Sequence, residues 1–311
     1  MRYKVLVTCP PMLNAIKEFE ELFEQHNMEI TAPKTEQVLS VKDLCSLVPQ
    51  HDGWIIGDDP ANAEVLKQGK LGRLKAAVKW GVGVDNIDFK KAEELKIPIK
   101  NTPGMFNAEV ADLAICYLIG LARDAFLIDR NVRNGVWHKP AGTSLSGKKV
   151  GIVGLGGIGQ SIAIRAAAHE MNVIGWDPAI KSELPESVDS INTWPNKLED
   201  VDFLVFACSL NKHTEKMFSQ SIFRYIKPGL KLINVSRGGL VDEHSLIKAL
   251  ESGIVSSAAM DVFEKEPISR DNPLMTFSSC IFGSHNASNT QEAVLRTSIE
   301  AINILKDFLN E

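Results

Sequence analysis

Short apolar runs alternate along the whole chain with longer segments in which apolar residues recur at helical spacing. Runs of this kind, bounded by polar or turn-forming residues, indicate buried strands, and the helical spacing indicates amphipathic helices. Strands are expected at 4–8, 54–56, 76–78, 149–153, 173–176, 202–207, 231–235 and 258–260, and helices at 13–23, 63–67, 109–133 and 292–309. Alternation of strand and helix predicts parallel sheets covered by helices, which is an α/β fold.

The pattern also predicts two domains, as the length of 311 residues does at about 150 residues per domain. A Gly- and Ser-containing stretch at 142–147 separates the long helical segment 109–133 from a new strand at 149–153. A continuous strand–helix series then runs to about residue 285. We therefore predict one domain at 100–285, inserted into a second domain made of 1–99 plus 286–311.

Composition narrows the class of protein. Apolar residues make up 44% of the chain and charged residues 23%, which is ordinary for a globular protein. The net charge of −5 argues against a nucleic-acid partner. The longest apolar run, 113–122, is too short to span a membrane, which needs about 20 residues. The five cysteines are scattered and never spaced as CxxC, so we expect reduced thiols, no metal site and a cytoplasmic location.

The strongest single motif follows the strand at 149–153. It has the form Gly154-x-Gly156-x-x-Gly159 and opens a helical run, an arrangement in which glycines let a pyrophosphate approach the helix N-terminus. Asp177 stands eighteen residues later, at the end of the next strand, where an acid accepts hydrogen bonds from the ribose hydroxyls of NAD. Lys181 lies close to Asp177 in sequence and could attract the 2′-phosphate of NADP, so NADP stays an alternative. The candidate cofactor-binding residues here are Gly154, Gly156, Gly157, Ile158, Gly159 and Asp177.

Three later segments and one earlier segment complete a recognisable pattern. They are 234–243 (Asn-Val-Ser-Arg-Gly-Gly-Leu-Val-Asp-Glu), 261–267 (Asp-Val-Phe-Glu-Lys-Glu-Pro), 284–287 (Ser-His-Asn-Ala) and 79–86 (Lys-Trp-Gly-Val-Gly-Val-Asp-Asn). With the glycine loop they closely resemble the NAD-dependent D-isomer-specific 2-hydroxyacid dehydrogenases, which include phosphoglycerate dehydrogenase and hydroxypyruvate reductase. The resemblance covers nearly the whole chain. It implies two doubly wound parallel-sheet domains, with a Rossmann NAD-binding domain inserted into a flavodoxin-like substrate domain.

Three residues in these segments have the chemistry that reduction of a 2-oxo acid needs. Arg237 offers a planar guanidinium that matches a carboxylate at two points. His285 is a natural proton donor to the ketone oxygen, because histidine changes charge near neutral pH. Glu266 could pair with one ring nitrogen and fix the tautomer, as the resemblance implies for these positions.

The resemblance assigns further residues to the cofactor and to the substrate. Asp261 is expected near the nicotinamide carboxamide, and Ser209 and Val235 on the cofactor side. On the substrate side, Lys79 offers a second cation, and the side chain of Trp80 either shapes the pocket or fills the core. The full set of these expected residues is Ser209, Val235 and Asp261 for the cofactor, and Lys79, Trp80, Gly81 and Val82 for the substrate.

The resemblance implies a small D-2-hydroxy acid or 2-oxo acid as the substrate, with 3-phosphoglycerate as one candidate. Asp58 and Asp59 stand where several phosphoglycerate dehydrogenases carry a basic residue, and they would repel a phosphate unless they point to solvent. The sequence ends at Glu311, and we therefore expect neither the small regulatory domain that many phosphoglycerate dehydrogenases carry nor inhibition by serine through it. The alternatives are a hydroxypyruvate or glyoxylate reductase and, in another class, an NADH-sensing corepressor without turnover. The ordered set of Arg237, Glu266 and His285 argues against a third class, a methyltransferase that uses another kind of glycine-rich loop.

A homodimer is also expected. The long helix that starts at Glu109 has more apolar face than a cofactor domain alone needs. The family resemblance implies the same two-fold arrangement.

Overall fold

The computed structural model describes residues 2–180 and 183–310, so Lys181 lies outside the described residues. The chain forms two compact units. The first unit contains the residues up to Phe106 and those from Asn289 onward, and the second contains Asn107–Ser288.

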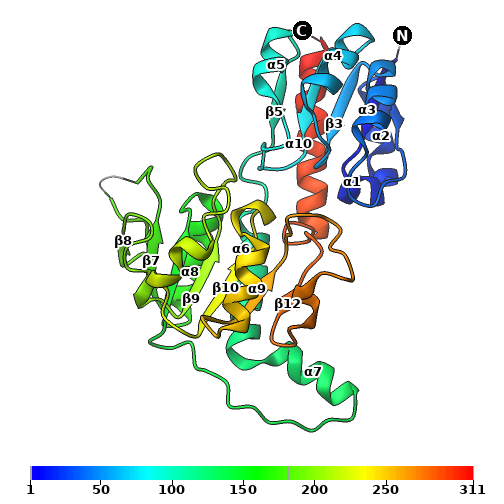
Figure 1. Cartoon of the computed structure of the whole chain (residues 1–311). Helices are drawn as coiled ribbons and strands as arrows, with labels where there is room; N and C mark the ends of the chain where they lie inside the picture. Colours follow the sequence, from blue (N-terminus) through cyan, green and yellow to red (C-terminus); the bar gives the residue numbers. More distant parts are fainter. Residues whose placement is uncertain (1, 181–182, 311) are drawn as a thin grey trace. The chain divides into compact units, whose positions relative to one another are not determined.

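A parallel sheet forms the centre of the first unit (Figure 1). Among the described residues its strands are β1 (Tyr3–Val7), β2 (Met28–Thr31), β3 (Gly53–Ile56), β4 (Ala76–Lys79) and β5 (Ile99–Asn101). They lie in the order β2-β1-β3-β4-β5 and pair in parallel throughout. This is the strand order of the flavodoxin-like fold, so the fold predicted for this part of the chain is confirmed.

The helices of the first unit come from both ends of the chain. They are α1 (Pro10–Asn14), α2 (Glu20–Gln25), α3 (Val41–Leu47), α4 (Ala63–Leu71), α5 (Phe89–Glu94) and α10 (Gln291–Asn310), with 3-10 turns at Ile16–Phe19 and Val48–Gln50. The single helix predicted at 13–23 is wrong. Helix α1 starts at a proline pair and ends at Asn14, because Ala15 leaves the helical region with φ −108° and ψ 15°, and α2 starts only after the 3-10 turn.

The predicted C-terminal helix is confirmed as α10, which packs on β3 and β4 (Figure 1). The contact is close because Gly53 has no side chain: a Cβ there would lie 2.9 Å from a methyl carbon of Leu305. On β4's side, the indole N–H of Trp80 donates to the hydroxyl of Ser298 at 3.0 Å. Helix α10 thus covers the centre of the sheet.

The second unit is built on a larger parallel sheet. Its described strands are β6 (Lys149–Val153), β7 (Asn172–Trp176), β8 (Ser190–Ile191), β9 (Phe203–Phe206), β10 (Leu230–Asn234), β11 (Val255–Met260) and β12 (Ile281–Phe282). Their order is β12-β11-β10-β9-β6-β7-β8, all parallel. The strand order reverses between β6 and β9, as in a Rossmann fold, so this prediction is confirmed as well.

Helices flank this sheet. They are α6 (Asn107–Arg123), α7 (Ala125–Arg133), α8 (Gly157–Ala168) and α9 (Glu243–Glu251), with 3-10 turns at Leu198–Asp200, Gln220–Tyr225, Gly238–Leu240 and Pro273–Thr276. The central strand β9 is buried along its whole length, and β10 is buried at every position except Lys231, as in other sheets covered on both faces. Aromatic rings extend the core at its β7 end, where Trp176 meets Trp194 edge to face at 5.6 Å between centroids.

The single long helix predicted at 109–133 is wrong. It is broken at Asp124, whose backbone is left-handed at φ 51°, so α6 ends at Arg123 and α7 starts at Ala125 in a new direction. Gly120 makes room for this turn, since a Cβ there would lie 2.6 Å from the ring of Phe126. Helix α6 packs on α8, β10 and β11 of its own chain. Its apolar face is therefore not the support for a homodimer that the sequence suggested.

The segments that follow the parallel strands carry most of the predicted site residues. The glycine motif follows β6, Asp177 follows β7, and Arg237 follows β10. Asp261 follows β11 and His285 follows β12. Because carboxyl ends of parallel strands share one edge of a sheet, the second unit collects these residues at one edge, where ligands of open α/β sheets bind. In the described part of the chain, no helix is long and apolar enough to cross a membrane.

Candidate active site

The glycine loop between β6 and α8 leaves no room for side chains where its backbone folds tightly. Gly154 has a φ of +91°, and a Cβ on Gly159 would lie 1.9 Å from the carbonyl oxygen of Gly154. At Gly156, in contrast, a Cβ would meet nothing within 4 Å. Gly156 is also the N-cap of α8 and provides no side-chain cap, so the first turn of this helix presents its backbone to an open space.

This loop fits the pyrophosphate of a dinucleotide. Backbone N–H groups and the positive end of the α8 dipole attract phosphate oxygens, and the open face at Gly156 admits them. Gly157 and Ile158 form the first turn of the helix. A Cβ on Gly157 would lie 2.5 Å from the amide of Asn107, so this glycine serves the packing of α8 against the start of α6.

Asp177 connects the end of β7 to the glycine loop. Its Oδ2 accepts the N–H of Leu155 at 2.8 Å, and its Oδ1 accepts the N–H of Ala179 at 2.9 Å. Each carboxylate oxygen has a second lone pair, so the group can also accept from ribose hydroxyls. The arrangement of strand, loop, helix and acid fits NAD, as the sequence predicts.

Arg237 lies three residues beyond the end of β10 and is the N-cap of the 3-10 turn Gly238–Leu240. The side chain of Asn234 holds this turn, donating to the carbonyl oxygen of Arg237 at 2.9 Å. Only glycine fits at position 238, because a Cβ there would lie 1.9 Å from the backbone of Phe263. The half-buried guanidinium of Arg237 donates to the carbonyl oxygen of Ser236 at 3.0 Å.

His285 and Glu266 lie in direct contact. Nδ1 of His285 is 2.7 Å from Oε2 of Glu266, and each side chain is 20% exposed. The second oxygen of Glu266 accepts the N–H of Phe263 at 2.9 Å. A carboxylate on Nδ1 selects the tautomer in which this nitrogen carries a proton, so Nε2 is the ring nitrogen that is available for chemistry.

Asp261 is fully buried and holds the loop that carries His285. Its Oδ2 accepts the N–H of Ala287 at 2.9 Å, and its carbonyl oxygen accepts the N–H of His285 at 2.7 Å. Its Oδ1 accepts the hydroxyl of Tyr117 at 3.1 Å. Tyr117 was missed in the sequence, where it is one apolar position of a helix and carries no signal of a polar role.

The other two residues expected on the cofactor side lie on neighbouring segments. Val235, directly after β10, is 7% exposed, and Ser209, beyond β9, is exposed. The carbonyl oxygen of Ser209 accepts the hydroxyl of Thr214 at 2.7 Å, which shapes the turn after β9. Both belong to the same edge of the sheet as the glycine loop.

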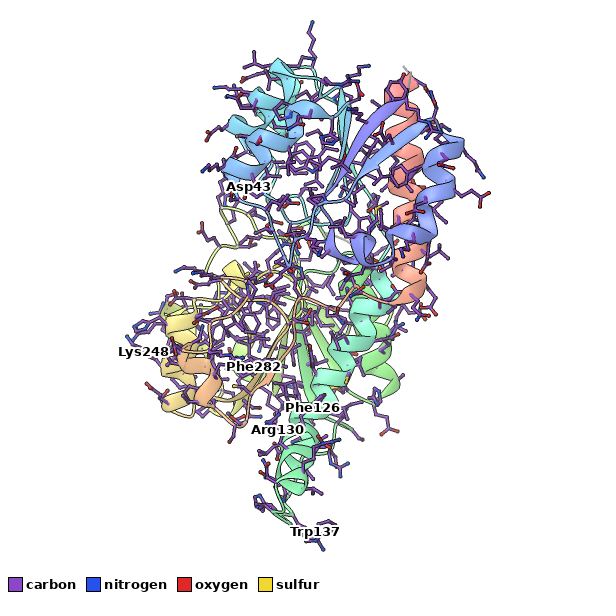
Figure 2. All side chains as sticks on the ribbon, turned by 90° about the vertical axis from the view of Figure 1, so that its right-hand side faces the viewer. Asp43, Phe126, Arg130, Trp137, Lys248 and Phe282 are labelled. Atoms are coloured by element: carbon purple, nitrogen blue, oxygen red, sulfur yellow. The ribbon has the colours of Figure 1, made fainter. Side chains whose placement is uncertain are left out.

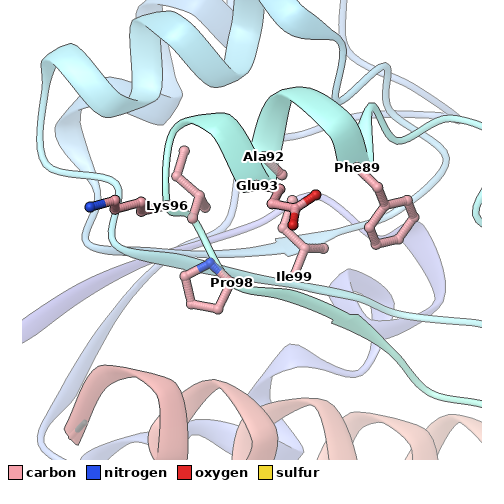
Figure 3. A pocket seen from close by; sticks show the side chains of 7 residues that line it. Phe89, Ala92, Glu93, Lys96, Pro98 and Ile99 are labelled. Atoms are coloured by element: carbon pink, nitrogen blue, oxygen red, sulfur yellow. The ribbon is translucent and has the colours of Figure 1, made fainter.

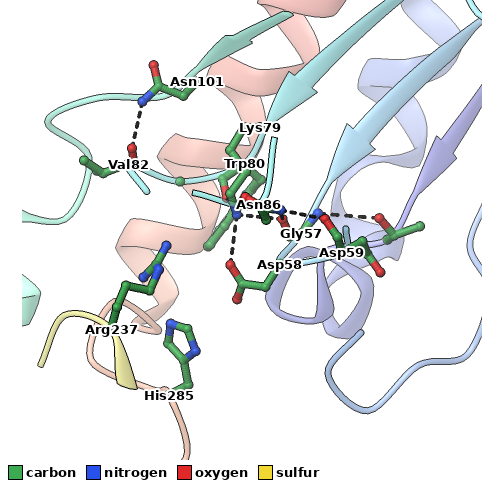
Figure 4. Close-up of polar contacts among 12 residues, drawn as sticks. Gly57, Asp58, Asp59, Lys79, Trp80, Val82, Asn86, Asn101, Arg237 and His285 are labelled. Atoms are coloured by element: carbon green, nitrogen blue, oxygen red, sulfur yellow. Dashed lines mark hydrogen bonds and ion pairs between the residues drawn. The ribbon is translucent and has the colours of Figure 1, made fainter. Parts of the chain in front are cut away.

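The four residues expected on the substrate side belong to the first unit, at and after β4 (Figure 4). Gly81 has a φ of +126° and donates its N–H to the hydroxyl of Thr102 at 2.8 Å. Val82 is 37% exposed. The ring of Trp80 is 5% exposed and lies 5.2 Å from that of Phe106, so of its two expected roles the structure supports core filling.

Lys79 is buried and its ammonium group is fully engaged. Nζ donates to the carbonyl oxygens of Gly57 at 2.6 Å and Trp80 at 3.3 Å, and it pairs with Oδ1 of Asp58 at 3.1 Å (Figure 4). An ammonium has three protons, so these three acceptors saturate it. Asp58 therefore neutralises the cation that the sequence assigns to the substrate.

Asp59 differs from its neighbour Asp58. It is fully buried, and its Oδ1 accepts the N–H of Leu39 at 2.7 Å. Burial raises the pKa of this carboxyl above its ordinary value. Asp59 thus does not point to solvent, and it organises the loop after β3.

A shallow hollow of about 540 Å³ lies on the first unit between α5 and β5 (Figure 3). Its lining residues are Phe89, Ala92, Glu93, Lys96, Ile97, Pro98 and Ile99. Residues 96–98 precede β5, so the hollow lies at the amino end of this strand, whereas Lys79 and Val82 lie at the carboxyl end of β4. It contains none of the predicted site residues. Among the described residues, no group of three or more His, Cys, Asp or Glu side chains could hold a metal ion.

Comparison with known proteins gives consistent matches. Residues 115–287 match the model of the D-isomer specific 2-hydroxyacid dehydrogenase, NAD binding domain. The chain is 36% identical over 299 residues to a D-3-phosphoglycerate dehydrogenase of Methanocaldococcus jannaschii, covering 93% of this chain and 54% of that protein. It is 31% identical to a hydroxypyruvate reductase of Thermotoga maritima, covering 97% and 96% of the two chains.

A solved structure agrees over the full length. The crystal structure of a glyoxylate reductase from Paecilomyes thermophila superimposes with a TM-score of 0.84 at 27% identity, covering 100% of this chain and 96% of that one. The chain spans about half the length of the archaeal phosphoglycerate dehydrogenases that it matches.

Proposed function

This chain belongs to the D-isomer specific 2-hydroxyacid dehydrogenase family, and on that basis we propose that it transfers a hydride between NAD(H) and a small D-2-hydroxy acid or its 2-oxo acid. The observation that carries the proposal is the contact of His285 with Glu266, on the sheet edge that also bears Arg237 and the glycine loop. This is the constellation of a proton donor, its orienting acid and a carboxylate-binding cation.

NAD would be held by the second unit. The loop at Gly154, Gly156 and Gly159 and the first turn of α8, with Gly157 and Ile158, would take the pyrophosphate, and Asp177 the adenosine ribose. Val235, Ser209 and Asp261 would line the remaining cofactor side. When bound, NAD supplies or accepts the hydride at the carbon that carries the substrate oxygen.

The chain's own residues bind the acid and move the proton. Arg237 would bind the carboxylate of the substrate through two parallel hydrogen bonds and so orient the neighbouring carbon. In reduction, His285 gives the proton on Nε2 to the developing alkoxide, and in oxidation it takes that proton back. Glu266 holds the ring and stabilises its charged form, which is the form that donates.

The ion pair between Lys79 and Asp58 favours substrates without a second negative charge. A phosphate would need a cation with open donors, whereas the donors of Lys79 are engaged by Asp58 and two carbonyl oxygens. We therefore favour a small acid such as hydroxypyruvate or glyoxylate over 3-phosphoglycerate. The hydroxypyruvate reductase and glyoxylate reductase relatives are named for such acids.

The test is oxidation of NADH against a panel of 2-oxo acids: hydroxypyruvate, glyoxylate, pyruvate, phosphohydroxypyruvate and bulkier analogues. Preferred turnover of one uncharged-tail acid, abolished in His285→Ala and Arg237→Ala variants that still bind NADH, supports the proposal. Tight binding of NADH without turnover of any acid would overturn it and favour the NADH-sensing class.

We also propose that the chain works as a homodimer in the cytoplasm. Helix α7 buries none of its residues, and apolar side chains on it and just beyond it are exposed: Phe126 37%, Val132 44%, Val136 52% and Trp137 77%. Figure 2 shows Phe126 and Trp137 on this part of the chain. A second copy of the chain would cover them.

Sedimentation measures whether the chain is a dimer. We expect Trp137→Ser to weaken the dimer, whereas Leu71→Ser, at an exposed position of the first unit, is the control and should leave it unchanged. An unchanged dimer in Trp137→Ser would contradict it, and cell fractionation tests the location.

A further inference from the structure

The backbone of His285 has a conformation that residues with side chains seldom adopt. Its φ of +55° lies in the left-handed region, where the Cβ crowds the following carbonyl. Such a residue keeps its conformation only when the surrounding contacts hold it there. Those contacts therefore decide where the imidazole of His285 stands.

Asp261 supplies these contacts on both sides of Asn286. Its carbonyl oxygen accepts the N–H of His285 at 2.7 Å, and its Oδ2 accepts the N–H of Ala287 at 2.9 Å. Asp261 has no exposed surface, so water does not compete for these bonds. The carboxylate must keep one orientation for Oδ2 to reach Ala287.

Tyr117, on α6, fixes that orientation from the other side. Its hydroxyl donates to Oδ1 of Asp261 at 3.1 Å. Burial of the phenol and the adjacent Asp261 carboxylate raise the pKa of Tyr117, so the hydroxyl keeps the proton that it donates. With Oδ1 engaged by Tyr117, Oδ2 is the oxygen that faces the loop.

Gly283 allows these two side chains to meet. A Cβ at this position would lie 2.0 Å from Oδ1 of Asp261 and 2.4 Å from the hydroxyl oxygen of Tyr117. The glycine directly follows β12 and lies two residues before His285. The hydrogen bond between Tyr117 and Asp261 therefore occupies space that is open only because residue 283 is a glycine.

We propose that Tyr117 is a positioning residue for the proton transfer: through Asp261 it holds residues 285–287, and so keeps the imidazole of His285 beside Glu266. The inference rests on the proposed function, in which His285 moves the proton. The chain of contacts is Tyr117 hydroxyl to Asp261 carboxylate, Asp261 to the amides of His285 and Ala287, and His285 Nδ1 to Glu266.

The variant that tests this is Tyr117→Phe, which removes only the hydroxyl. Its matched control is Tyr3→Phe, because the hydroxyl of Tyr3 also makes one hydrogen bond, to the carbonyl oxygen of Leu309 at 2.7 Å in the first unit. We expect Tyr117→Phe to lower kcat for the preferred 2-oxo acid roughly 10-fold with KM changed less than about twofold, since Arg237 is on a different loop. Tyr3→Phe should leave both constants unchanged.

A second readout does not depend on turnover. The ring signals of His285 in an NMR spectrum, assigned by their loss in His285→Gln, report the position of the imidazole relative to Glu266. We expect them to shift and broaden in Tyr117→Phe and to stay in place in Tyr3→Phe. Should Tyr117→Phe fail to fold, Tyr117→Met fills the same space without a hydroxyl and takes its place.

The two readouts together decide the matter. Unchanged ring signals in a folded Tyr117 variant overturn the positioning role, whatever the change in kcat, and so does an unchanged kcat with displaced signals. If the unmodified chain reduces no 2-oxo acid, the proposed function fails, whereas the ring signals still show whether Tyr117 holds His285.

Discussion

Nδ1 of His285 lies 2.7 Å from Oε2 of Glu266, and the other oxygen of that carboxylate accepts the N–H of Phe263 at 2.9 Å. The acid is therefore held at both oxygens, one by the backbone and one by the imidazole. A carboxylate fixed in this way gives the ring one tautomer and one direction.

Replacing this acid tests the proton transfer. We expect Glu266→Gln to lower kcat for reduction about 10- to 100-fold, because the amide carries no charge to balance the protonated ring and has one acceptor oxygen for the two N–H groups that the acid accepts. Steady-state kinetics with NADH and the preferred 2-oxo acid measures the loss.

The control for this variant is Glu264→Gln, which removes the same charge two residues away. Glu264 is exposed and contacts Glu243 and Lys216 instead of the histidine. Equal losses in the two variants would contradict the role given to Glu266.

Two glycines of the loop after β6 should respond differently to alanine. At Gly156 a Cβ meets no atom within 4 Å, so Gly156→Ala should fold normally but weaken NADH binding roughly 10-fold, because the methyl group occupies the space proposed for the pyrophosphate. At Gly159 the Cβ would lie 1.9 Å from Gly154. Gly159→Ala should therefore lose thermal stability as well as affinity.

Fluorescence titration with NADH and thermal unfolding separate the two effects. Wild-type affinity in Gly156→Ala would mean that the pyrophosphate does not pass over this glycine.

Asp58 should control whether phosphorylated acids are accepted. In Asp58→Asn the ammonium of Lys79 loses its ionic partner. The net charge of the two side chains then changes from zero to +1. We expect kcat/KM for phosphohydroxypyruvate, relative to hydroxypyruvate, to rise about 10-fold, as each tenfold step corresponds to about 1.4 kcal/mol of added attraction.

The matched control is Glu93→Gln, which makes the same charge change beside the hollow at the amino end of β5. It should leave the ratio of the two specificity constants unchanged. A ratio that does not move in Asp58→Asn would show that Lys79 does not meet the substrate.

Asp242 offers a test of pH-dependent stability. It caps α9, accepting the N–H of Ser245 at 3.0 Å, and the Ser245 hydroxyl and then Lys216 lower the pKa of its carboxyl from 3.8 to about 2. A lowered pKa in the folded state means that this stabilisation is present above pH 3.8 and is lost as the pH falls toward about 2.

Asp242→Ala should cost about 1 kcal/mol of unfolding free energy at neutral pH, and less as the pH falls through this window. Asp242→Asn keeps an acceptor at the cap and should show a smaller loss without that pH dependence. Urea unfolding at several pH values measures this, and a pH-independent loss in Asp242→Ala would contradict it.

The sequence predicts the features that rest on local patterns. The strand at 149–153, the glycines after it and Asp177 lie within one strand–helix–strand unit, and the structure places them together. The number of residues between the glycines and Asp177 is set by the length of the helix and strand that separate them. The pattern alone predicts parallel sheets, and the doubly wound strand order of both sheets is what the resemblance to the dehydrogenase family implies.

Features that depend on contacts between distant residues do not show in the sequence. Tyr117 and Asp261 are 144 residues apart, and nothing near Tyr117 distinguishes it from the apolar residues of its helix. The break at Asp124 is local, with Gly120 leaving room for the ring of Phe126, but apolar residues keep their helical spacing across it and the pattern therefore does not reveal it. The ion pair of Lys79 with Asp58 likewise depends on the folded sheet, because Asp58 follows β3, Lys79 ends β4, and the two strands are neighbours only in the sheet.

The return of α10 to β3 and β4 has a consequence for how the chain folds during synthesis. The second unit is continuous in sequence, from Asn107 to Ser288, so all of its strands have left the ribosome before α10 begins. The face of β3 and β4 that α10 covers, with Leu305 against Gly53, is completed only when the residues of α10 (Gln291–Asn310) emerge. Synthesis from the N-terminus therefore favours the second unit as the first to fold, with the earlier-made part of the chain completed last.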